Sequence, residues 1–137
     1  MRATDNAAGL ESLDAMIARV RSYGRGMGEK VARAAAPLIE AAAKKTAAAG
    51  TTPDGVAWKP KKDGGRPLEH AAEHLSAKAV GASVVLTLSG KAEVVHNFGN
   101  EKDPKRQILP SGGGPLPKGI EAAARKAAIS VFQRGAP

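Results

Sequence analysis

The sequence predicts an α+β fold, with a long N-terminal helix that is kinked or broken, a small antiparallel β-sheet and an amphipathic C-terminal helix, joined by long extended loops. Apolar residues recur at spacings of three and four residues over residues 10–49 and 118–133, as in helices. The segment SVVLTL at residues 83–88 has instead the β-branched and apolar content of a strand. A length of 137 residues suits one domain, and we expect a single domain over residues 1–137.

The N-terminal helix has two expected points of weakness. Its first apolar positions are Leu10, Leu13, Ile17 and Val20. The segment YGRGMG at residues 23–28 then contains three glycines, each of which costs a helix about 1 kcal/mol relative to alanine. We therefore expect a break or bend there, and a kink at Pro37 unless a second helix starts just before it.

Two long loops are expected, at residues 51–67 and 99–117. The first reads TTPDGVAWKPKKDGGRP, with three prolines, three glycines and six charged residues, and no regular element tolerates that composition. Fully extended, it would reach roughly 55 Å, more than the width of a domain of this size. We interpret it as an arm that crosses to another subunit.

The segments between and after these loops are shorter. Residues 68–76 are compatible with a short helix, and residues 77–88 form two runs around Gly81. Residues 92–98 suit either a third strand or a short helix. In the closing helix, at residues 118–133, one stripe is apolar. Its members are Ile120, Ala124, Ala127 and Val131.

The composition limits the core that the chain can build. It has 28 alanines, but Leu, Ile, Val and Phe together number only 25. Since burial of a large side chain contributes roughly 1.5 to 3 kcal/mol, this chain has little hydrophobic stabilisation to set against its conformational entropy. We expect neighbouring copies to supply part of its stability.

Other bulk features exclude some classes of function. The absence of cysteine excludes disulfides and thiolate zinc sites. No apolar run approaches the ~20 residues of a membrane span, and the N-terminus lacks a signal-peptide pattern, so we expect a soluble protein made in the cytoplasm. A net charge of +8 permits contact with nucleic acid or an acidic partner.

Four segments, read in order, resemble the virion morphogenesis or tail-completion family of tailed bacteriophages. TTPDGVAWKP at residues 51–60 is similar to a T-x-x-G-x-x-W element that follows the family's long helix, and residues 61–68 match its basic linker and leucine. VVHNFG at residues 94–99 and PKRQILP at residues 104–110 are similar to two later elements. The sequence departs from the family in lacking a tyrosine before HNFG and in HAAEHL at residues 70–75.

The resemblance implies a structural virion protein and not an enzyme, with no cofactor or metal. Such a protein completes the tail or sits in the neck and joins tail to head. It implies a homo-oligomer, with a six-fold ring around a channel for DNA, in the virion after assembly in the host cytoplasm. The expected partners are the connector or stopper, the tail tube and the terminator.

The candidate interface residues in the first loop are Trp58, Lys59, Lys61, Lys62 and Arg66. A lone tryptophan in a polar loop either folds back on its own core or anchors into a partner, and in a ring Trp58 would dock on a neighbouring subunit. The four cations either form a solvated loop or face phosphates. The second alternative underlies a competing hypothesis, a sequence-independent DNA-binding protein.

The remaining candidates are His96, Phe98 and Arg106. His96 lies among apolar neighbours, which favours a partly buried, hydrogen-bonded histidine over a subunit contact. Lys105 and Arg106 stand beside Asp103, which suggests surface or intersubunit ion pairs.

One motif points to metal chemistry. His70, Glu73 and His74 spell H-x-x-E-H, in which two histidines one helical turn apart hold zinc and the glutamate activates water. A zinc peptidase also needs a third ligand and a substrate cleft, which a short chain with few large apolar residues is poorly equipped to build. A solvated, charged helix face is the preferred interpretation.

Overall fold

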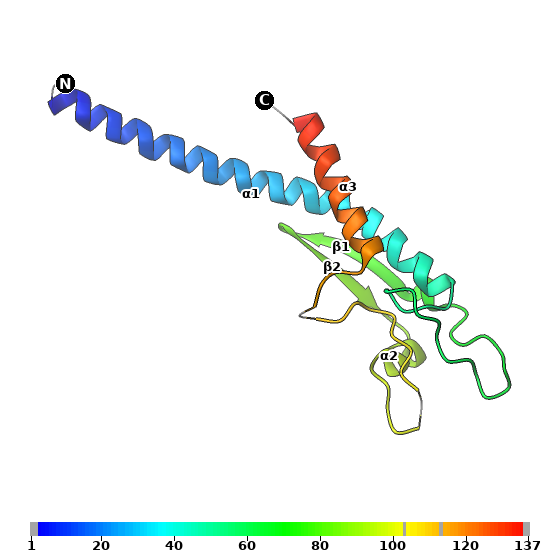
Figure 1. Cartoon of the computed structure of the whole chain (residues 1–137). Coiled ribbons are helices and arrows are strands. Elements are labelled where there is room, and N and C mark those ends of the chain that lie inside the picture. The colour runs from blue at the N-terminus through cyan, green and yellow to red at the C-terminus, as the bar shows by residue number, and fades with distance from the viewer. Residues whose placement is uncertain (1–2, 103, 113, 136–137) are drawn as a thin grey trace.

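The computed structural model describes residues 3–102, 104–112 and 114–135, leaving out the side chains of residues 3–14, 16, 19–22 and 135. One long helix, α1 (Ala3–Ala48), organises the molecule (Figure 1). A hairpin of β1 (Leu75–Val80) and β2 (Ser83–Leu88) and the C-terminal helix α3 (Lys118–Gly135) pack on its C-terminal half. The α+β architecture predicted from the sequence is thus confirmed.

The break expected in the N-terminal helix does not occur, because α1 continues through all three glycines and past Pro37 to Ala48. Gly28 faces the turn of the hairpin, where an added Cβ would lie only 3.0 Å from the Cβ of Ala82. That glycine therefore permits close packing of the turn against the helix. Pro37 is exposed, so the backbone carbonyl freed by its missing N–H lies on a face that water can reach.

The hairpin is antiparallel, with Leu75 opposite Leu88 and Val80 opposite Ser83. The two-residue turn begins at Gly81, whose φ of +59° is a conformation that glycine adopts without strain. Alternate residues of β2 are half-buried, and these include Val84 and Leu86. The two runs around Gly81 are thus the two strands of one small sheet.

Two short helices complete the fold. The 3-10 helix η1 (Ala71–His74) lies within the region where a short helix was expected. The α-helix α2 (Lys91–Phe98) resolves the alternative left open for residues 92–98 in favour of a helix. Among the described helices, none is long and apolar enough to cross a membrane.

The core consists largely of alanine and divides into two clusters. The first joins the C-terminal end of α1 to Trp58, Leu75 and Ile108. The second lies where α1 meets α3, around Ile39 and Ile120. The predicted apolar stripe of α3 is confirmed, since Ala124 is half-buried and its other three members are buried. Leu75 and Ile108 are the largest fully buried side chains among the described residues, so the core is as thin as the composition predicts.

Candidate functional site

Three segments of the chain, the first of them more than 30 residues from the other two, meet beyond the C-terminal end of α1, and we call them the loop junction. They are residues 50–60, residues 93–99 on α2 and its end, and residues 104–110. Figure 1 shows α2 and the two long loops at the end of the molecule opposite the N-terminus. The loop junction contains three of the four segments that carry the family resemblance.

The first segment is a tight turn followed by an anchor. The Thr52 hydroxyl oxygen accepts the N–H of Val56 at 3.1 Å, and the Thr52 carbonyl accepts the N–H of Gly55 at 2.9 Å. Gly55 has a φ of +89°, which a residue with a side chain rarely adopts. The turn brings Trp58 back to the fold, where its backbone N–H donates to the Gly50 carbonyl at 2.9 Å.

Trp58 packs within its own chain. Its side chain is 6% exposed, in contact with the alanines at the end of α1, and its indole N–H donates to the Gln107 carbonyl at 2.8 Å. An apolar ring with a satisfied N–H is the favourable way to bury tryptophan. The prediction that residues 51–67 form an extended arm is therefore wrong for residues 51–60, and the largely exposed part of the loop is confined to residues 61–66.

The second segment holds the third through one side-chain amide. Asn97 is buried on α2, and its Oδ1 accepts the backbone N–H groups of Ile108 and Leu109, both at 2.9 Å. These two bonds place Ile108 in the core with 1% of its surface exposed. Gly99 then ends α2 with a φ of +74°, close to the backbone of Lys105.

Arg106 ties the third segment to the first. Its Nε donates to the Lys59 carbonyl at 2.7 Å and its Nη2 to the Pro60 carbonyl at 3.2 Å, while Nη1 lies 3.1 Å from Nδ1 of His96. A guanidinium group carries several N–H donors in one plane, so it can bind several acceptors at once. Arg106 is buried and donates to backbone carbonyls, so its guanidinium does not lie on the surface as expected, and its ion pair with Asp103 stays a prediction. Asp103 lies outside the described residues.

His96 is half-buried and bound inside the chain, as the favoured alternative predicted. Its carbonyl accepts the Arg106 N–H at 2.7 Å, and its Nδ1 also lies 3.1 Å from the Pro104 carbonyl. Three of the candidate interface residues, namely Trp58, His96 and Arg106, are thus bonded within their own chain.

The other five candidates present side chains to solvent. Phe98, at the end of α2, is 72% exposed, and the side chains of Lys59, Lys61, Lys62 and Arg66 are also exposed. The loop junction therefore combines a bonded interior with the exposed side chains of Phe98 and Lys59, and the other three cations lie on the loop that follows residue 60. Such a surface is suited to contact with a partner.

The H-x-x-E-H residues do not converge on one point. Nδ1 of His70 lies 3.3 Å from Oε1 of Glu73, and both side chains are exposed. His74 turns instead to Glu93 of α2, with Nε2 and Oε1 3.5 Å apart. In the described part of the chain, no three His, Asp or Glu side chains are placed to hold a metal ion.

Two important contacts lie outside the candidates chosen from the sequence. Asn97 lies between His96 and Phe98, and its place in the VVHNFG segment is the one signal that marks it. Glu40 accepts the N–H of Ala77 at 3.0 Å and so joins α1 to β1. In the sequence, Glu40 looks like any other charged residue on a helix, so no sequence signal marks it as a contact to β1.

No protein-family model, curated protein or solved structure matches this chain.

Proposed function

We propose that the protein is a structural subunit of a tailed bacteriophage particle that completes the tail and joins it to the head as a member of a homo-oligomeric ring. The observation that carries this proposal is the loop junction. The residues that resemble the tail-completion family are those that bond its three segments together, through Trp58, Asn97 and Arg106. Because these residues hold the fold together, their resemblance to the family supports a common fold more strongly than similarity at unconnected surface positions would.

The surface of the chain supports a role in assembly. Large apolar side chains are exposed on several elements, among them Phe98 on α2 and Ile129 and Phe132 on α3. A thin alanine core and uncovered aromatic rings are typical of subunits that gain stability from neighbours. In a ring, such surfaces would lie between copies.

The basic loop supports a second candidate function. Lys59, Lys61, Lys62 and Arg66 are exposed within one short segment, which also contains Asp63. A sequence-independent DNA binder would use them to neutralise phosphates, and its affinity would fall steeply as salt rises. Within the ring, the same cations would contact DNA passing through the channel.

A complementation experiment tests the proposed function. Phage that carry a nonsense codon early in the gene for this chain are expected to accumulate filled heads and separate tails, visible by electron microscopy. Purified wild-type protein added to that lysate should restore joined, infectious particles. A variant with Asn97→Ala, which loses the clamp on Ile108 and Leu109, serves as the matched negative control. Joined particles in the absence of the protein would contradict the proposal.

A further inference from the structure

The N-terminal half of α1 extends past the rest of the fold. Figure 1 shows this half leading away from the hairpin and from α3, which both cover the other half of the helix. Ile17 is 39% exposed on it, and Leu10, Leu13 and Val20 share its helical spacing in the sequence. A helix with an apolar stripe gains most of its stability by packing that stripe against another surface.

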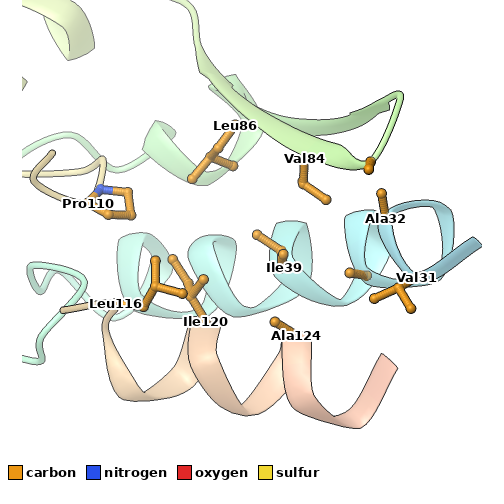
Figure 2. A pocket seen from close by; sticks show the side chains of 11 residues that line it. Val31, Ala32, Ile39, Val84, Leu86, Pro110, Leu116, Ile120 and Ala124 are labelled. Carbon is orange, nitrogen blue, oxygen red and sulfur yellow. The ribbon is translucent and has the colours of Figure 1, made fainter. Parts of the chain in front are cut away.

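The fold also contains an open apolar groove. Figure 2 shows Val84 and Leu86 of β2 on one side, Ile39 of α1 at the base, and Ile120 and Ala124 of α3 on the other side. The hollow has a volume of about 350 Å³, and every side chain that lines it is apolar. Its walls are the strand β2 and the helix α3, with Pro110 and Leu116 of the second loop at one end. Apolar grooves of this kind bind the apolar face of amphipathic helices.

The N-terminal half of α1 cannot reach the groove of its own chain. The base of the groove is formed by residues 31–39 of the same helix, and α1 is continuous from Ala3 to Ala48. A straight helix does not fold back on itself, so a helix that enters this groove must come from another molecule.

Charge favours a second copy of this chain as that molecule. Residues 3–20, which form the segment in question, contain three acidic residues and one basic residue, whereas residues 21–137 contain nineteen basic and ten acidic residues. An acidic amphipathic segment and a basic body attract each other and orient the encounter.

We propose that residues 3–20 of one copy lie in the groove of the next copy, with the stripe that contains Ile17 packed against Val84 and Ile120. Because helix and groove are different surfaces of one chain, the contact is head-to-tail, and it closes into a ring when the rotation between copies allows. The contact specifies how the proposed ring is joined, but it requires only self-association and not a place in a phage tail.

Cross-linking of two single-cysteine variants tests the contact. The chain has no native cysteine, so Ile17→Cys and Val84→Cys each introduce a single reactive site. The two purified full-length variants, one with a mass tag, are mixed and treated with a short bismaleimide. Ala15→Cys and Val85→Cys are the matched controls, since Ala15 lies two residues from Ile17 on the helix and Val85 points to the opposite face of the hairpin from Val84.

We expect the pair of Ile17→Cys and Val84→Cys to give at least about tenfold more mixed dimer than either pairing that contains a control variant. Circular dichroism of each variant verifies that it is folded. Equal yields for all pairings, or no mixed dimer, would overturn the proposal and leave the groove to a different protein. Mixed dimers from a protein that fails to join tails to heads would support the contact and contradict the proposed function alone.

Discussion

Single side chains hold distant loops of this protein together by bonding to their backbone. Asn97 accepts two N–H groups of one loop, and Arg106 donates to two carbonyls of the other. Trp58 adds a third such bond, to Gln107. Because these partners are backbone groups, each bond fixes the path of a loop that has no regular secondary structure of its own.

Asn97→Ala should destabilise the protein through this mechanism. The change leaves the N–H groups of Ile108 and Leu109 without their acceptor, and each unsatisfied buried donor costs about 1 to 3 kcal/mol. We expect a loss of roughly 2 to 4 kcal/mol in the free energy of unfolding, measured by urea denaturation.

Gln133→Ala is the control for this substitution. Gln133 is an exposed amide side chain on α3, where water solvates it, so the loss should stay below about 0.5 kcal/mol. Equal losses for the two variants would contradict the role of Asn97 as a clamp.

At the scale of elements, the continuity of the helix α1 depends on the elements that pack on it as well as on its own residues. Its glycines predict a break, yet it continues, because α3 and the hairpin cover the helix just beyond them. Gly24 has no atom within 4 Å of an added Cβ, whereas Gly28 meets Ala82. Glycine is thus required for close packing at Gly28 but not at Gly24, although both lie on the same helix.

Two alanine substitutions separate these consequences. Gly24→Ala should stabilise the protein by up to about 1 kcal/mol, because alanine is the better helix former and the added methyl group meets open space. Gly28→Ala should lose that gain or destabilise the protein, since the new Cβ would press on the hairpin turn. Thermal unfolding of both variants measures the difference, and equal shifts in Tm would contradict the close approach at Gly28.

Local patterns in the sequence predict most elements of this molecule. The spacing of Ile120, Ala127 and Val131 predicts α3 and its buried face, and SVVLTL predicts β2, because both signals lie within one element. The loop junction lacks such a signal. Trp58 and Gln107 are 49 residues apart, so their contact depends on the whole fold, and the sequence allowed two positions for the indole.

Over the whole molecule, charge and shape are polarised along α1. The acidic start of the helix projects away from a basic body, and the loop junction lies at the far end. A chain with a projecting segment, an open groove and a thin core is suited to associate with copies of itself. This polarity is the physical basis of the proposed ring.

The most direct test of this account is the mass of the purified protein by light scattering, alone and with isolated phage tails. We expect a species several times the 14.0 kDa of one chain, which also binds at tail ends. Ile17→Asp, which places a charge on the projecting apolar stripe, should return the mass to that of one chain, while Ala15→Asp should not. A wild-type protein that stays monomeric at every concentration, ignores tails and instead shifts DNA would contradict the account.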